Sequence, residues 1–270
     1  MSVRSKNNSR SWEETITDEQ RQRIIEIWMR SREALSSVVE EMKITQAELK
    51  LAGQYFNRLG QSEMFPSLMI VALGMTSLRV VEGAMGGTPH NVEGPFHVAD
   101  APVRVNGVLF EKEPTAAAQY LDVRGRVRDA ISGEGIPDAI IDVWQADENG
   151  SYDQVGFHLR GRIVSDANGR YELHTIVPKD YAEHDDDPIG ELFRAMRSTN
   201  RRAAHIHIRV DCEGYRPLTT QLFMPDADHL DDDYLEGAVI PELVLSTEGT
   251  RKDSHIKAQF DFSMVPESRA

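Results

Sequence analysis

The feature that most constrains the fold is a change in apolar periodicity at a Gly-Gly-Thr-Pro segment, residues 86–89. Before this segment, apolar residues recur at the period of an amphipathic helix. After it, Leu121, Val123 and Val127 alternate with polar residues, which is the period of a half-buried strand. Short strands separated by turns, with no helical pattern between them, indicate an antiparallel β-sandwich. The sequence therefore predicts a mainly β protein with a helical N-terminal part.

Three helices are expected before the break. Thr17 and Gln20 fit a capping box at the start of the first helix. Thr45 opens a second helix that stops near Gly60, and a third runs over residues 65–81. Each carries an apolar stripe that needs a partner surface. That surface is either the protein's own β part or the same helices of a second subunit.

Charge and composition exclude several classes of function. The formal net charge is −14, with no cluster of Lys and Arg, which argues against nucleic acid and anionic membranes as partners. No apolar run approaches the length of a membrane span, so no membrane insertion is expected. The single cysteine, Cys212, leaves no internal disulfide and fits a cytoplasmic location. The acidic clusters 185–187 and 231–233 lack the pattern of a calcium loop and are interpreted as solvated loops.

A pair of histidines is the strongest sign of chemistry. His205 and His207 alternate with Ile206 and Ile208, so on a strand both imidazoles point to one face and the apolar residues to the other. Two neutral imidazoles directed at one point supply half of a transition-metal site. An isolated pair of this kind is more often two histidines on the polar face of an ordinary strand. The residues around the pair must therefore distinguish a metal site from an ordinary strand.

Two tyrosines precede the histidines in unusual settings. Tyr152 ends a turn that follows an apolar strand, and Tyr181 follows a strand that breaks at Pro178, which places it in a loop. The order Tyr, Tyr, His-x-His, with Arg202 and Gln221 flanking the histidines, resembles the intradiol ring-cleavage dioxygenases. The resemblance is greatest to the catechol 1,2-dioxygenase and hydroxyquinol 1,2-dioxygenase branch. It extends over five segments in order: 92–98, 142–153, 162–178, 202–210 and 219–223.

This resemblance implies a non-haem Fe(III) site and a reaction. Its four ligands would be Tyr152, Tyr181, His205 and His207. Hard anionic phenolate oxygens favour the trivalent over the divalent ion, and a bound trivalent ion deprotonates a coordinating phenol. In the family, O2 and a catecholic substrate react so that the ring opens between the two hydroxylated carbons. Maleylacetate-type or muconate-type products are expected.

The resemblance also assigns roles to individual side chains. Tyr181 would leave the metal and accept a substrate proton, and Arg202 would stabilise the anionic ring. Gln221 would support the site from beside the bound tyrosinate. The substrate pocket is expected to be lined by Leu78, Val81, Gly94, Pro95, Phe96, Ala182, Glu183 and Leu235.

One segment departs from the family pattern. Many relatives carry a proline-rich apolar run after the second tyrosine ligand, where this chain has Ala182, Glu183 and His184. These residues are expected to make the pocket roomier and more polar. If Glu183 and His184 face the pocket, a ring with an extra hydroxyl should be preferred over plain catechol.

The family plan also predicts the domain organisation and the assembly. Residues 1–90 are expected to form a helical dimerisation domain, and residues 91–270 a β-sandwich catalytic domain. The chain would then pair through its N-terminal helices as a homodimer. Two other classes of protein remain as alternatives. One is a zinc hydrolase that uses the His-x-His pair, although such enzymes commonly sit on barrels of alternating helices and strands. The other is a metal-free sandwich that serves as a binding module.

Overall fold

The computed structural model describes residues 16–82, 86–250 and 252–267, and the side chains of 81 and 82 lie outside that description. The three expected helices are present as α1 (Asp18–Met42), α2 (Gln46–Gln61) and α3 (Phe65–Glu82). The capping box is confirmed, since Thr17 and Gln20 exchange side-chain and backbone hydrogen bonds. A matching exchange between Thr45 and Glu48 begins α2.

The chain divides into two compact units, Met1–Arg58 and Leu59–Ala270, so α3 groups with the strands that follow it. The domain boundary expected at residue 90 stays a prediction. No single described helix is long and apolar enough to cross a bilayer, and only the bent pair Gln46–Gln61 with Phe65–Val80 has the combined length and composition.

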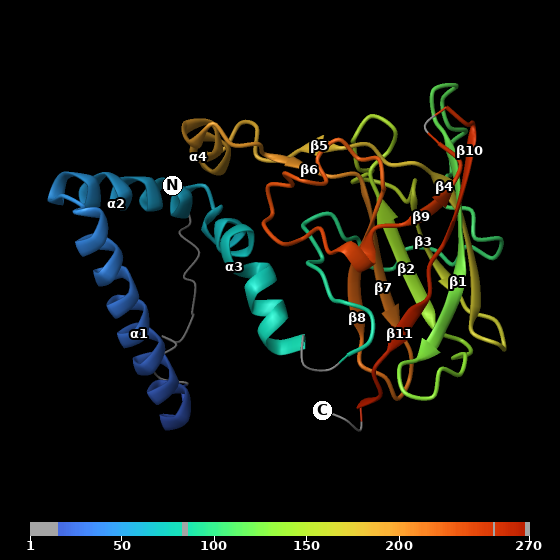
Figure 1. Ribbon diagram of the computed structural model, residues 1–270, viewed down its shortest axis with the longest axis horizontal. Helices are drawn as coiled ribbons and strands as arrows, with labels where there is room; N and C mark the ends of the chain where they lie inside the picture. The colour runs from blue at the N-terminus through green and yellow to red at the C-terminus, as the bar shows by residue number, and fades with distance from the viewer. Residues whose placement is uncertain (1–15, 83–85, 251, 268–270) are drawn as a thin grey trace, which may run out of the picture. The chain divides into compact units, whose positions relative to one another are not determined.

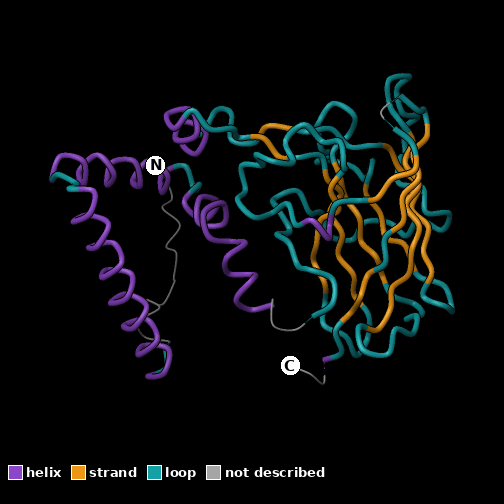
Figure 2. Tube along the Cα trace, viewed as in Figure 1, coloured by secondary structure: helices purple, strands orange, loops and turns teal. Residues whose placement is uncertain are grey.

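Two main sheets form the β part (Figures 1 and 2). One contains β1 (Tyr120–Asp129), β4 (Arg170–Ile176), β9 (Ser246–Glu248), β10 (His255–Gln259) and β11 (Phe262–Met264). The other has the order β3 (Arg160–Val164), β2 (Ile140–Gln145), β7 (His205–Asp211) and β8 (Leu218–Phe223). A third pairing joins the short strands β5 (Tyr181–Ala182) and β6 (Arg201–Arg202). A helix, α4 (Pro188–Met196), and a 3₁₀ turn, Pro241–Leu243, lie in the connections.

The inner faces of the two sheets share one hydrophobic core. Leu121 and Val123 of β1 and Ile141, Ile206 and Ile208 of the second sheet are all buried in the same cluster. The alternation seen in the sequence therefore marks the core face, and the sandwich is confirmed. It departs from a purely antiparallel plan where β1 pairs in parallel with β10 and β11.

The turn at residues 166–169 connects the two sheets. Asp166 N donates to Arg170 O and Gly169 N to Asp166 O, which closes a tight turn. The strands on either side pair with different partners, β3 with β2 and β4 with β1. The turn is thus a link between layers.

The environment of Tyr181 differs from the expected loop. Tyr181 is the first residue of β5 and pairs with Arg202 of β6. Pro178 ends the preceding strand, as expected, but the chain pairs again after only a few residues. The sequence signal was missed because a strand of two residues has no periodicity to detect.

A core substitution on β7 tests this packing. Ile208 is buried on the face opposite the histidines, so Ile208→Ala should lower the free energy of unfolding by about 2–5 kcal/mol. The matched control Val155→Ala truncates a fully exposed side chain and should change stability by less than about 0.5 kcal/mol. Urea unfolding followed by circular dichroism measures both. Equal effects for the two variants would contradict the assigned register.

Candidate metal centre

The two histidines lie where the strand pattern predicted. β7 lies between β2 and β8, with His207 opposite Trp144 on one side and Gln221 on the other. Both imidazoles are buried, and their Nε2 atoms are 3.0 Å apart. The Trp144 indole stacks on the His207 ring, with centroids 4.9 Å apart and the planes 4° from parallel. The pair is therefore held rigidly on one face of the sheet.

The two tyrosines complete the cluster. Tyr152 lies in the connection after β2, and its hydroxyl is 3.5 Å from the Tyr181 hydroxyl. The ring centroid of Tyr181 is 5.8 Å from that of His205, and Tyr152 is 6.1 Å from His207. The structure thus brings together all four residues that the sequence singled out. Tyr171 is elsewhere, with its hydroxyl donating to Phe260 O at 2.8 Å.

The protonation states of the histidines suit metal coordination. Burial, assisted by the nearby Arg202 cation, holds the pKa of His205 well below its usual range, and burial does the same for His207. Both imidazoles are therefore neutral at physiological pH. His205 Nδ1 is 2.6 Å from the carbonyl oxygen of Ala203, so this nitrogen carries the proton and Nε2 keeps its lone pair.

The donor set fits a metal ion. Ligand atoms about 2 Å from one ion lie roughly 3 Å from each other, which matches the separations of the two nitrogens and of the two oxygens. Burial raises the pKa of both phenols, so a strong positive charge is needed to make them phenolates. Among the described residues, no group of three His, Cys, Asp or Glu side chains is arranged to hold a metal. The zinc hydrolase alternative therefore lacks a third ligand of the usual type.

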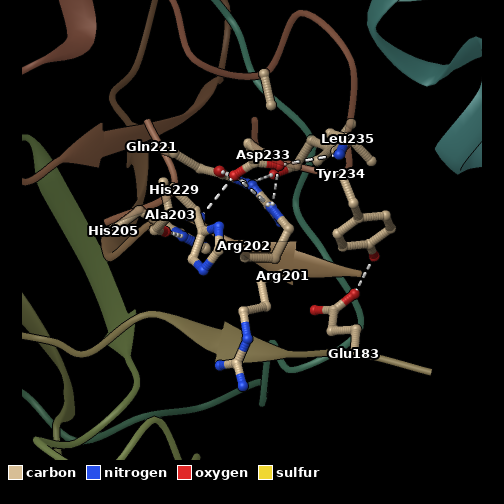
Figure 3. A network of polar contacts seen from close by, with 12 residues as sticks. Glu183, Arg201, Arg202, Ala203, His205, Gln221, His229, Asp233, Tyr234 and Leu235 are labelled. Atoms are coloured by element: carbon tan, nitrogen blue, oxygen red, sulfur yellow. Dashed lines mark hydrogen bonds and ion pairs between the residues drawn. The ribbon is translucent and has the colours of Figure 1, made fainter. Parts of the chain in front are cut away.

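Arg202 is fixed beside this cluster by two partners (Figure 3). Its Nε donates to both oxygens of Asp233, at 3.0 and 3.1 Å, and its Nη2 donates to Gln221 Oε1 at 2.6 Å. Burial disfavours the guanidinium charge, but the acidic groups around it, Asp233 foremost, together outweigh burial and raise the pKa of Arg202. Gln221 in turn donates from Nε2 to Val92 O at 2.8 Å. Arg202 and Gln221 thus belong to one buried network.

Two acidic residues were misassigned from the sequence. Asp233 was interpreted as part of a solvated loop, yet its side chain is only 3% exposed and accepts the Arg202 ion pair. Asp187 caps α4 by accepting hydrogen bonds from Ile189 N and Gly190 N. An Asp before Pro188 is a recognisable helix start, so Asp187 could have been found. Asp233 had no such signal, because its partner lies 31 residues away.

The residues expected to line the pocket fall in three groups. Gly94 has a positive φ of 72°, and a Cβ there would come within 3.1 Å of the His207 ring, so only glycine fits this approach. Phe96 follows Pro95 and stacks on Tyr152, with centroids 4.4 Å apart. Ala182 and Glu183 follow Tyr181 directly. The remaining three come from other parts of the chain: Leu78 and Leu235 pack in or against the hydrophobic core, and the Val81 side chain lies outside the described part.

Comparisons with known proteins agree with this geometry. The family model described as "Dioxygenase" matches residues 92–266. The chain is 32% identical to a 6-chlorohydroxyquinol 1,2-dioxygenase of Cupriavidus pinatubonensis, covering 86% of this chain and 87% of the relative. It is 32% identical to a chlorocatechol 1,2-dioxygenase of a Pseudomonas strain, over 80% of this chain and 86% of that one. The crystal structure of a 3-chlorocatechol 1,2-dioxygenase of Rhodococcus opacus superposes with a TM-score of 0.82 at 27% identity, over 91% and 99% of the chains.

The buried ion pair gives a stability test. Removing the carboxylate in Asp233→Ala leaves the Arg202 charge buried without its partner, which should cost about 3–5 kcal/mol of unfolding free energy. The control Asp231→Ala removes an exposed carboxylate from the same loop and should cost less than about 0.5 kcal/mol. Chemical denaturation measures both values. Similar stability of the two variants would show that the loop is solvated after all.

Proposed function

Because this chain belongs to the intradiol ring-cleavage dioxygenases, we propose that it cleaves a catecholic ring with a ferric ion that its own side chains hold. The proposed ligands are Tyr152, Tyr181, His205 and His207. One observation carries the proposal. The two neutral imidazole nitrogens are 3.0 Å apart, the two phenol oxygens are 3.5 Å apart, and each tyrosine ring lies about 6 Å from a histidine ring in the same buried cluster.

The donor set favours the ferric state. Two phenolates and two neutral imidazoles carry a total charge of −2, which attracts a trivalent ion more strongly than a divalent one. When bound, the ion would supply the electron withdrawal that makes a catecholate ring reactive toward O2. The protein's part is to bind the ring, take up its protons and stabilise its charge.

The tyrosines and Arg202 perform these tasks. A catechol that binds through both oxygens must lose two protons. Tyr181, as the phenolate that a bound ferric ion would create, would accept one of them, and a hydroxide at the site would accept the other. Because β5 contains only two residues, few hydrogen bonds oppose a movement of Tyr181. Arg202 stays charged because of Asp233, and Gln221 fixes its direction, so the guanidinium stabilises the negative charge on the ring. Burial lowers the pKa of both histidines and so keeps them neutral, and the charge of Arg202 adds to this effect.

The substrate pocket follows from the same placement. We assign its wall to Phe96 with Gly94 and Pro95 on one side, and to Ala182 and Glu183 on the other. Leu235 is included because its backbone N donates to Asp233, the partner of Arg202. Leu78 of α3, partly buried against the core, is kept as a further wall residue, and Val81 stays a prediction because its side chain lies outside the described part. The substrate is a catecholic ring, consistent with the substrates that the names of the relatives give for those proteins.

A substitution of one ligand tests the metal assignment. The purified protein should contain one iron per chain and absorb visible light, because tyrosinate bound to Fe(III) is coloured. Tyr152→Phe should remove or strongly shift that band and lower kcat by roughly 100-fold or more. The control Tyr171→Phe alters a buried tyrosine of the opposite sheet and should keep the band. Metal analysis, absorption spectra and oxygen uptake with catechols give the readouts.

Two outcomes would contradict this assignment. Stoichiometric zinc with no visible band would show that the site holds a different ion. A Tyr152→Phe protein with an unchanged spectrum would show that this phenol is not a ligand.

We further propose that the N-terminal helices pair two copies of the chain. α1 contains no buried residue, and Trp28, Leu35 and Met42 are 68%, 65% and 72% exposed. These residues recur at seven-residue spacing, so they form one apolar stripe along the helix. Exposed apolar stripes of this length mark protein–protein contacts. The proposed homodimer has residues 17–82 at or near its interface.

Light scattering tests the dimer. The parent protein should have twice the chain mass at micromolar concentration, and the double variant Trp28→Asp/Leu35→Asp should be monomeric because it buries two charges in the interface. The control Ser37→Asp adds a charge on the opposite side of an ideal helix and should stay dimeric. A monomeric parent protein would overturn the proposal.

A further inference from the structure

Glu183 is anchored close to the proposed metal ligands. It lies two residues after Tyr181, where the β5–β6 pairing continues by one further exchange. Glu183 N donates to Asn200 O at 3.0 Å, and Asn200 Nδ2 donates to Glu183 O at 2.6 Å. The backbone is therefore held at this position, and the Glu183 side chain is only 10% exposed.

The two carboxylate oxygens of Glu183 have different environments (Figure 3). Oε2 accepts a short hydrogen bond from the Tyr234 hydroxyl. Oε1 is buried and has no hydrogen-bond partner within the described residues. In Figure 3 the second oxygen is turned away from the Tyr234 ring. A buried acceptor of this kind is unfavourable unless a donor reaches it, so the structure shows an unmet need for one O–H or N–H group.

The Glu183 carboxylate belongs to the same part of the fold as the proposed ligands and Arg202. It lies two residues after Tyr181, in the segment that pairs with the strand of Arg202. Tyr234, which holds Oε2, directly follows Asp233, the partner of Arg202. Glu183 therefore belongs to the wall of the same site, on the side from which Tyr181 comes.

His184 does not share this role. Its Nδ1 is hydrogen-bonded to Asp187 Oδ2 at 2.6 Å. Its Nε2 is 3.9 Å from Glu183 Oε2, the oxygen that already accepts the hydrogen bond from Tyr234. Its φ of 62° also excludes proline, the residue expected there from relatives. Both ring nitrogens of His184 thus lie near carboxylates, whereas Glu183 keeps an unused acceptor, so a test belongs at position 183 alone.

We propose that Glu183, oriented by Tyr234, accepts a hydrogen bond from a further hydroxyl group of the catecholic substrate, so that the preferred substrate class is the trihydroxylated ring. A substrate that carries a carboxylate at the same ring position is repelled by the negative charge of Glu183. This inference rests on the proposed ring cleavage. It concerns only the selection among rings.

Three rings that differ at one position test the inference: catechol, hydroxyquinol and 3,4-dihydroxybenzoate. For each, kcat/KM and the dissociation constant under anaerobic conditions are measured with the iron-loaded protein. The parent should prefer hydroxyquinol to catechol. In Glu183→Leu the ratio of kcat/KM for hydroxyquinol to that for catechol should fall by about 10- to 150-fold, which corresponds to the loss of a hydrogen bond to a charged group. The discrimination against 3,4-dihydroxybenzoate should weaken in the same variant.

Two further variants separate charge from hydrogen bonding. Glu183→Gln keeps a hydrogen-bonding group without the charge. The hydroxyquinol-to-catechol ratio of kcat/KM should therefore fall less than in Glu183→Leu, while the discrimination against 3,4-dihydroxybenzoate should weaken to the same extent. Tyr234→Phe removes the hydrogen-bond donor to Glu183 Oε2. It should lower the hydroxyquinol-to-catechol ratio of kcat/KM, but by a smaller factor than Glu183→Leu does. The control Glu242→Leu, in the exposed Pro241–Leu243 turn, should keep the parent ratios.

The possible outcomes separate a failure of the role proposed for Glu183 from a failure of the proposed ring cleavage. A Glu183→Leu or Glu183→Gln protein with the parent's ranking of the three rings would overturn the role of Glu183, and so would a parent that prefers catechol. In both cases ring cleavage itself would stand. A parent that cleaves none of the rings would contradict the proposed function, and this inference with it.

Discussion

The hydrogen-bonded ladder that holds β7 between β2 and β8 is the constraint on which the rest of the site depends. Because side chains alternate along a strand, this register directs His205 and His207 to one face and Ile206 and Ile208 into the core. A slip by one residue would exchange the two sets and remove both imidazoles from the site. The burial of the isoleucines therefore fixes the position of the proposed ligands.

Buried charge links the other parts to this ladder. Gln221, opposite His207 on β8, binds Arg202, and Arg202 binds Asp233 in the connection after β8. A buried ion pair contributes little net stability, since its desolvation offsets the attraction. Its effect here is on orientation and charge. The guanidinium is held beside the site, and it adds to the effect of burial, which lowers the pKa of His205 so that its Nε2 atom stays available to a metal ion.

The sequence predicted what depends on local pattern. The capping residue Thr17 and the alternation around Val123 identified the first helix and a core strand, and the family resemblance of the order Tyr, Tyr, His-x-His identified the cluster. Contacts between distant segments were not predictable in this way. No local pattern pairs Asp233 with Arg202, joins Tyr234 to Glu183 or places Tyr181 in a two-residue strand. Those contacts form only when connections on the same end of the sandwich meet.

The convergence of four donor atoms on one ferric ion is the central claim, and anomalous X-ray scattering from crystals of the purified protein tests it most directly. The account predicts a single strong peak per chain at the iron absorption edge, about 2 Å from the Nε2 atoms of His205 and His207 and from the phenol oxygens of Tyr152 and Tyr181. A peak that appears only at the zinc edge would contradict the account. So would an iron peak that lacks either tyrosine as a neighbour.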